Sequence, residues 1–403
     1  MKSLDSSVRN YSWGSKTMIP QLLGQPAGDN PVAELWFGAH PAAPATLDGT
    51  RLDEVIAGDP ETHLGHRVRS THGDRLPFLL KLLAAEDVLS LQAHPSKAQA
   101  EEGFARENAQ GVALDSSQRN YKDDNHKPEL IVALTEFYAM AGFRPLARTR
   151  ELFAALDCPS LERYLSMLDD DPAAEGASLR ALFTTWITIP AGVRKELIAD
   201  IVTAGERLVA APAPGTPEWI VRDVRTVLGI NEQYPGDIGV LGALLLNHIV
   251  LQPGEAVFLA AGQLHAYVHG LGVELMANSD NVLRGGLTPK YVDVPELVKV
   301  LDFQAVADPQ VHPGHANPAA GCEVFDYPVP IDEFSLRRYA LDAGAQATVE
   351  LDGPAIVLCT RGDGATAGGV RLTPGRGAWA PAADGRVNLA AGDSPAEFFV
   401  ASV

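Results

Sequence analysis

The sequence predicts a mainly β protein that carries an α-helical insertion, and three patterns support this fold class. Residues 1 to about 145 consist of short apolar runs broken by Gly, Pro and Asn, which is typical of strands joined by turns. From about residue 145 to 234 the apolar residues recur at helical intervals. Strand-like runs return near residue 247 and continue to the end of the sequence. The helices therefore interrupt a chain that consists otherwise of strands.

The same patterns predict the domain organisation, because 403 residues exceed the usual size of one compact unit. We expect one domain to be formed by residues 1–145 together with 236–307. A helical domain follows at 146–235 and a C-terminal β domain at 308–403. The helical segment is then an insertion or an added layer, and not a separate functional unit.

In the first domain, runs 33–38 and 78–83 are apolar, and Pro77 opens the second, as expected for buried strands. Run 88–94 alternates instead. In extended geometry alternate side chains point to opposite faces, so one face of this run carries Val88, Ser90, Gln92 and His94.

Within the helical segment, two sets of apolar residues recur at helical spacing. They are Leu179, Leu182, Phe183 and Trp186, and Leu197, Ile198, Ile201, Val202 and Leu208. Thr216-Pro217-Glu218 predicts a helix start, with a cap, a first-turn proline and an early acid. Residues 210–215 form the linker that precedes it.

Strand signals resume after the helices. A Pro253-Gly254 turn precedes the apolar run 256–260. Residues 263–269 then alternate, so that one face carries Gln263, His265, Tyr267 and His269. Beyond residue 308, turns at 342–344 and 361–364 separate short strands, which suits a C-terminal domain of jelly-roll type.

The composition excludes several classes of partner. The chain is 46% hydrophobic, with a net charge of −19 at pH 7 and a pI near 4.9. An acidic surface repels nucleic acid phosphates and anionic lipid, so we expect neither nucleic acid nor a membrane as partner. No apolar run reaches the roughly 18 residues of a membrane span, and the sequence shows no secretory signal. We expect a cytoplasmic protein in which an anionic substrate needs a locally basic pocket.

The cysteines Cys158, Cys322 and Cys359 are widely spaced and include no C-x-x-C pair. Such an odd, sparse set indicates neither a disulfide framework nor a cysteine zinc site. We expect all three to be buried as small apolar residues.

Two polar strings, Gln92-Ala93-His94-Pro95 and Asn125-His126-Lys127-Pro128-Glu129, lie in or beside strand-like runs. Gln92 and His94 share a strand face, Glu129 adds a carboxylate, and His265 adds a second imidazole. Two nitrogen and two oxygen ligands suit Zn²⁺, although Mn²⁺, Fe²⁺ and Co²⁺ also fit such a set. On local grounds a core histidine and a lysine-paired carboxylate remain open alternatives.

Several motifs are similar to those of type I mannose-6-phosphate isomerases, which are zinc enzymes of the cupin superfamily. The distinctive segments are 92–97 (QAHPSK), 121–129 (YKDDNHKPE) and 278–290 (NSDNVLRGGLTPK), and further matches lie at 11–14 (YSWG), 33–36 (AELW) and 265–267 (HAY). The matches run from residue 11 to about 294 and leave the helical segment and the last hundred residues without distinctive motifs. Ser96 stands where the family often has Asp, at a position not expected to bind metal.

This resemblance implies two cupin-type jelly-roll β-domains and one divalent metal, with zinc favoured. It assigns the ligand set to Gln92, His94, Glu129 and His265 and marks Arg284 as the active-site arginine. It also makes Ser90, Lys81 and Lys290 the expected phosphate contacts. For each lysine the alternative is a solvated or salt-bridged surface charge.

The implied reaction interconverts D-mannose 6-phosphate and D-fructose 6-phosphate through a cis-enediol(ate) and so supplies mannose-donor (GDP-mannose) synthesis. It needs a base at carbon and positive charge for the oxyanion. Arg284 stays cationic and is a poor base. We favour Glu274 as the base, with Lys127 or a water on the metal as alternatives. Glu274 could equally be a buried carboxylate paired to Arg284 or Lys290.

Trp13 and Tyr267 are expected to line the sugar pocket, unless they belong to the core. The expected partner is a small hexose phosphate, and we expect a monomer or a weak oligomer. Two rival functions are a non-catalytic cupin that binds sugar phosphate and a metal-dependent cupin oxygenase. The second fits Gln92 poorly, because such oxygenases rely on histidine-rich shells or on two histidines with one carboxylate.

Overall fold

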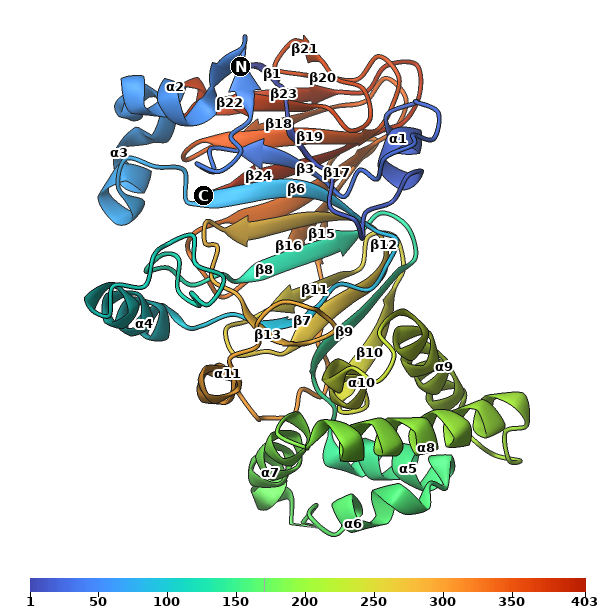
Figure 1. Ribbon diagram of the computed structural model, residues 1–403. Coiled ribbons are helices and arrows are strands. Elements are labelled where there is room, and N and C mark those ends of the chain that lie inside the picture. The colour runs from blue at the N-terminus through green and yellow to red at the C-terminus, as the bar shows by residue number, and fades with distance from the viewer. Residues whose placement is uncertain (170) are drawn as a thin grey trace.

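The computed structural model describes residues 1–169 and 171–403, with the backbone alone at 318 and 319. Helices take up 31% and strands 30% of the chain, so the fold is mixed and contains more helix than a mainly β protein with one helical insertion would have. Several antiparallel sheets form the body of the molecule. Helices α5 to α9 gather at one end of it, and the C-terminal strands lie at the other end, together with both chain termini (Figure 1).

The largest sheet has 11 strands, and a 7-stranded sheet packs against it. The larger sheet contains β2 (Ser7–Arg9), β3 (Glu34–Gly38), β6 (Phe78–Ala85), β7 (Leu91–Ala93), β8 (Glu129–Ala133), β9 (Phe137–Phe143), β10 (Leu246–Leu251), β11 (Ala256–Leu259), β12 (His265–Ala277), β13 (Leu283–Gly286) and β14 (Gln310–Val311). The 7-stranded sheet contains β1 (Lys2–Leu4), β15 (Gly314–Ala319), β16 (Cys322–Tyr327), β17 (Ser335–Leu341), β19 (Ala355–Arg361), β22 (Gly377–Ala380) and β24 (Ala396–Ser402).

Two smaller sheets and the helices complete the fold. The smaller sheets are β18 (Gln346–Glu350), β20 (Thr366–Ala367), β21 (Val370–Arg371) and β23 (Arg386–Ala390), and β4 (Thr46–Leu47) with β5 (Thr50–Arg51). The α-helices are α1 (Met18–Leu22), α2 (Leu52–Gly58), α3 (Pro60–His72), α4 (Lys97–Ala109), α5 (Leu146–Leu156), α6 (Glu162–Leu165), α7 (Glu175–Ile187), α8 (Ala191–Ala210), α9 (Glu218–Gln233), α10 (Ile238–Ala243) and α11 (Val294–Val300). Short 3₁₀ turns occur at Pro159–Leu161, Pro172–Ala174 and Ala382–Asp384.

The predicted helices of the central segment are confirmed as α7, α8 and α9. Glu218 lies in the first turn of α9 as predicted, but Pro217 precedes the helix as its cap residue, and Thr216 does not cap it. Helices α1 to α4, in the segment predicted to consist of strands, were missed. Their start signals are ordinary ones: Asp59 caps α3 just before Pro60, and Ser96 with Gln99 forms a capping box on α4.

Strand β12 connects different parts of the large sheet, because its two halves pair with different strands. Its first residues pair with β9 and β7, and its residues from Gly270 onward pair with β6 and β8. Gly270 has a φ of 130°, and a Cβ there would lie 2.8 Å from the carbonyl oxygen of Glu136, so this change of partner requires glycine. His265 and Glu274 are thereby carried on one strand into the same region.

Strand alternation places polar residues of four adjacent strands on one face of the large sheet. On β6, Leu80 and Leu82 join a hydrophobic cluster with Leu336 and Phe399 of the 7-stranded sheet. Lys81, which lies between them, therefore points to the opposite face. The residues that share this face with Lys81 are Glu34 and Trp36 on β3, Glu129 on β8 and Glu274 on β12.

The predicted strand 88–94 is shorter than expected. Only Leu91–Ala93 pairs as β7, so Ser90 precedes the strand and His94 follows it. All three cysteines are buried and free, as predicted. Among the described residues, no helix has the length and apolar content to cross a membrane.

A buried ion pair anchors the helical segment to the sheet. Arg144, directly after β9, donates to Oδ2 of Asp223 on α9 at 2.9 Å and to the carbonyl oxygen of Leu244 at 3.1 Å. Side chains of both Arg144 and Asp223 are only 2% exposed. The guanidinium thus holds α9 against the strand ends without access to water.

We predict that Asp223→Ala lowers the free energy of unfolding by about 3–5 kcal/mol, because it leaves the Arg144 charge buried and uncompensated. Urea denaturation measures the change. Asp363→Ala is the matched control, since Asp363 is 89% exposed and its pair with Arg371 contributes at most about 1 kcal/mol. An equal, small effect of both substitutions would contradict the anchoring role.

Candidate metal centre and active-site pocket

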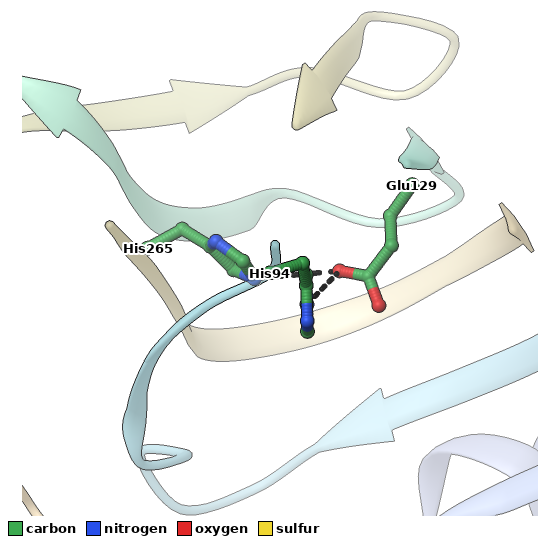
Figure 2. Close-up of side chains that lie close together, drawn as sticks. All are labelled: His94, Glu129 and His265. Carbon is green, nitrogen blue, oxygen red and sulfur yellow. Dashed lines mark ion pairs between the residues drawn. The ribbon is translucent and has the colours of Figure 1, made fainter. Parts of the chain in front are cut away.

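Three buried side chains converge at one point in the large sheet. Oε2 of Glu129 lies 3.4 Å from Nε2 of His94 and 3.3 Å from Nε2 of His265, and Figure 2 shows both imidazoles directed at this carboxylate oxygen. Each residue offers one atom to a group whose members all lie within 4.8 Å of one another. Both histidine side chains are completely buried, and that of Glu129 is 2% exposed.

Hydrogen bonds at the Nδ1 atoms of the two imidazoles fix which nitrogen of each ring points toward Glu129. Nδ1 of His94 lies 2.7 Å from the carbonyl oxygen of Asn281, and Nδ1 of His265 lies 2.9 Å from that of Gln263. Because a carbonyl only accepts, each Nδ1 carries the proton and each Nε2 presents a lone pair. None of the three inward atoms has a hydrogen-bond partner among the described residues. Two lone pairs and a carboxylate that face one another in a buried space are what a divalent cation requires.

The charges around the centre keep the ligands in the state that binds metal. Burial lowers the pKa of His94 to about 4, so its imidazole is neutral. Burial alone would raise the pKa of Glu129, but the Lys127 ammonium and the two imidazoles outweigh it and hold that pKa well below the usual range. A neutral imidazole and an ionised carboxylate are the forms that coordinate metals.

Gln92 lies between the centre and Arg284. In the sheet register Gln92 of β7 stands opposite His265 of β12 on one side and opposite Arg284 of β13 on the other. Directly opposed side chains on antiparallel strands lie about 4.5–5.5 Å apart at Cβ. The predicted fourth ligand is therefore next to a predicted ligand and to the predicted active-site arginine.

A cavity of about 480 Å³ opens beside the centre, within the usual size range of small-molecule sites. Ten of the sequence-predicted site residues line it: Trp13, Lys81, Ser90, Gln92, Lys127, Glu129, Tyr267, Glu274, Arg284 and Lys290. The other two, His94 and His265, lie directly behind Glu129. The structure thus brings the whole predicted set to one place, although Trp13 and Lys290 are 277 positions apart in sequence.

Glu274 lies inside a buried network of charges. Its Oε2 accepts from Nζ of Lys81 at 2.7 Å, and its Oε1 accepts from the Tyr267 hydroxyl at 2.9 Å. Nζ of Lys81 also lies 3.5 Å from Oε1 of Glu34, whose other oxygen accepts from the Trp36 indole. Glu274 is therefore paired with Lys81, and not with Arg284 or Lys290 as the sequence had left open.

The pKa of Glu274 is raised by its burial and by the nearby carboxylates of Glu129 and Glu34, which together outweigh Lys81. Lys81 has its own pKa raised by Glu274 and Glu34, in spite of its burial. The network therefore combines a firmly protonated lysine with a carboxylate that titrates closer to neutral pH. Lys127 donates to Oε1 of Glu129 at 2.9 Å, so its charge is also compensated.

The sequence did not indicate several of the pocket residues, because only contacts between strands and loops bring them to the pocket. Asp280 lines the pocket 3.5 Å from Nε2 of His40, whose hydrogen bond lowers the pKa of Asp280. Tyr234, after α9, lines the pocket and donates to the carbonyl oxygen of Val88 at 3.1 Å. The helical segment thus contributes one wall near Ser90. Its composition carried no signal of this.

The second polar string divides between two cavities. Lys127 and Glu129 face the metal centre, whereas His126 lines a separate cavity and pairs there with Glu333, before β17. Successive side chains of an extended segment point to opposite sides, so His126 points away from the side that carries Lys127 and Glu129.

The fold and the site together define a metal-binding enzyme of the antiparallel-sheet class whose pocket suits a small, negatively charged molecule. Residues 1–146 match the model for the catalytic domain of type I phosphomannose isomerase, and residues 324–367 match the model for its C-terminal part. The chain belongs to the type I phosphomannose isomerase family.

Known relatives cover almost the whole chain. Mannose-6-phosphate isomerase of Escherichia coli is 38% identical over 400 residues, which is 96% of this chain and 97% of the relative. The enzyme of the same name from Bos taurus is 33% identical over 89% of this chain and 87% of its own length. A crystal structure of zinc-bound mannose 6-phosphate isomerase superposes with a TM-score of 0.85 at 34% identity, covering 100% of this chain and 98% of that one.

We predict that His265→Gln weakens zinc binding by more than the roughly 10–100-fold that loss of a ligand-orienting residue costs. The reason is that one of three converging atoms is removed. Zinc content after dialysis, measured by elemental analysis, checks it. His269→Gln is the control on the same strand, because the only hydrogen bond of the His269 side chain among the described residues runs to the Glu86 carbonyl. Equal zinc in both variants would remove His265 from the ligand set.

Proposed function

We propose that this chain is a metal-dependent aldose–ketose isomerase that interconverts D-mannose 6-phosphate and D-fructose 6-phosphate. The observation that carries the proposal is the shared pocket, in which a buried two-histidine, one-carboxylate centre lies beside Arg284 and Lys290, which have no carboxylate within 4 Å among the described residues. Membership of the phosphomannose isomerase family supports it over a non-catalytic binding protein and over an oxygenase.

One divalent metal, Zn²⁺, is the cofactor, held by His94, Glu129 and His265. The convergence of three unpartnered buried atoms supports this ligand set, and we assign Gln92 as the fourth ligand from its position opposite His265. When bound, the metal polarises and orients the oxygens at C1 and C2 of the sugar.

Glu274 is the proposed base that moves the proton between C2 and C1. Its raised pKa suits general base catalysis near neutral pH, and the Lys81 ammonium and Tyr267 hydroxyl fix the orientation of its two oxygens. Lys127, the alternative, forms an ion pair with Oε1 of Glu129 at 2.9 Å, and so is less suited to accept a proton.

Arg284 is proposed to stabilise the enediolate, because it stays charged and stands next to Gln92 in the register. Ser90 and Lys290 are proposed phosphate contacts on the pocket wall, and Trp13 and Tyr267 are proposed to pack against the sugar. Lys81 remains a predicted phosphate contact, although its charge is already shared by Glu274 and Glu34.

The remaining assignments extend the proposal to the whole chain. We infer two cupin-type jelly-roll β-domains, formed by 1–145 with 236–307 and by 308–403, and a helical domain at 146–235. The protein acts in the cytoplasm, supplies mannose for GDP-mannose synthesis, binds neither nucleic acid nor membrane, and is a monomer or weak oligomer. The acidic net charge of −19 supports the exclusion of nucleic acid.

The direct test is a coupled assay of zinc-loaded protein with mannose 6-phosphate. We expect turnover to fructose 6-phosphate that a chelator abolishes and added zinc restores. Oxygen consumption by iron-loaded protein without isomerisation would favour the oxygenase instead, and no turnover at all in metal-replete protein would contradict the isomerase.

We predict that Glu274→Gln lowers kcat by roughly 10²–10⁴-fold, the usual contribution of a general base. In the parent enzyme, kcat/KM should fall as the pH drops through the raised pKa of Glu274, because protonation removes the base. Glu255→Gln is a control that removes an exposed carboxylate outside the pocket. A near-normal kcat in the Glu274→Gln variant would show that another group acts as the base.

We predict that Arg284→Ala keeps zinc and fold but loses kcat by roughly 10²–10³-fold, as when one oxyanion donor is removed. Arg284→Lys should recover only part of the rate, since an ammonium lacks the planar fork. Circular dichroism and zinc analysis verify fold and metal. Unchanged turnover in Arg284→Ala would exclude the oxyanion role.

A further inference from the structure

The basic residues that line the pocket divide into two groups by their partners. Lys81 and Lys127 each have a carboxylate oxygen within 3 Å of the ammonium, from Glu274 and Glu129 respectively. The other three, Lys122, Arg284 and Lys290, have no carboxylate within 4 Å among the residues that the structure describes. Three cations that have no carboxylate within 4 Å among the described residues therefore share one cavity in a chain with a net charge of −19. The carboxylate of Asp280 lines the same cavity, where the charge of Lys122 contributes to the lowered pKa of that group.

Lys290 lies close enough to Arg284 and Lys122 for both charges to act on its ammonium. Burial lowers the pKa of Lys290, and the charges of Arg284 and Lys122 lower it further. Burial also lowers the pKa of Arg284. Like charges held together in a partly buried wall are unfavourable unless a ligand supplies the opposite charge. A phosphate monoester, with a charge of about −1.5 to −2 at pH 7, matches such a cluster.

The backbone of Lys122 is fixed in place by Asn281. The Lys122 N–H donates to Oδ1 of Asn281 at 2.7 Å, and Nδ2 of Asn281 donates to the carbonyl oxygens of Asp123 and Asn125 at 2.8 Å each. Asn281 is completely buried, and its own carbonyl accepts from His94. One residue thus ties the loop that bears Lys122 to a metal ligand. The exposed side chain of Lys122 extends from this fixed point to the pocket mouth.

We propose that Lys122 is a specificity-determining residue that binds the substrate phosphate together with Arg284 and Lys290. The inference rests on the proposed function for the identity of the sugar, but the anion site itself rests on three cations without a carboxylate within 4 Å among the described residues. Lys122 is thus an addition to the phosphate contacts predicted from the sequence, of which Lys81 already has Glu274 and Glu34 as partners. Arg284 stands next to Gln92 in the sheet register.

The test compares Lys122→Met with the parent enzyme in KM, kcat and zinc content, and in the inhibition constant of inorganic phosphate. We expect KM for mannose 6-phosphate and the inhibition constant each to rise about tenfold, as for loss of one charge-assisted contact. We expect kcat and zinc content to change less than twofold. Lys122→Arg should recover most of the affinity, because it keeps the charge.

Two controls make the outcome decisive. Lys195→Met removes an exposed charge from α8, outside the pocket, and should leave KM unchanged, which separates a local contact from a general field effect. Lys122→Gln serves as a second neutral variant. Neutral variants that bind phosphate as tightly as the parent, or that lose kcat at constant KM, would overturn the role of Lys122.

The failure of this inference is distinguishable from failure of the proposed function. Calorimetric titration with inorganic phosphate needs no turnover, so it measures the anion site even in a protein that does not isomerise mannose 6-phosphate. Weaker phosphate binding in Lys122→Met supports the site whatever the sugar. If the Lys122→Met variant is an active isomerase and binds phosphate as tightly as the parent, only the role of Lys122 is refuted and the proposed function stands.

Discussion

The Nε2 atoms of His94 and His265 and Oε2 of Glu129 meet in a buried space, where none of the three has a hydrogen-bond donor among the described residues. Lys127 pairs with Oε1 of the same carboxylate, but a buried acceptor without a donor still costs free energy, and two imidazole lone pairs directed at Oε2 increase that cost. The carbonyls of Asn281 and Gln263 prevent the rings from turning their protons inward. A cation resolves the conflict, and the surrounding sheet is organised to keep these three atoms together. The long strand β12, which changes partners at Gly270, is the clearest part of that organisation.

The cations of the pocket differ in their carboxylate partners. Lys81 and Lys127 form ion pairs with Glu274 and Glu129, so their charges orient these carboxylates. Lys122, Arg284 and Lys290 have no carboxylate within 4 Å among the described residues, and they add the local positive potential that an acidic protein needs to capture a sugar phosphate. The reacting carbons of such a substrate would then lie between the anion site and the metal.

The sequence predicted the parts that depend on short-range pattern. Period-two alternation placed Gln92 on a polar face and Lys127 beside Glu129, and helical spacing located α7 to α9. The early helices were missed because their caps, such as Ser96, lie among Gly- and Pro-rich runs that resemble strands and turns. The partner of Glu274 could not be predicted, since sheet register joins residues 193 positions apart and brings Lys81 opposite Glu274. Asn281 and Tyr234 act through contacts with the backbones of distant loops, which no local pattern records.

X-ray absorption spectroscopy at the zinc edge of the zinc-loaded chain tests the central claim most directly. Zinc held as we describe has only nitrogen and oxygen neighbours at roughly 2.0–2.2 Å, with the outer-ring scattering of two imidazoles. Sulfur neighbours at roughly 2.3 Å, or a spectrum without imidazole scattering, would contradict a centre formed by His94, Glu129 and His265.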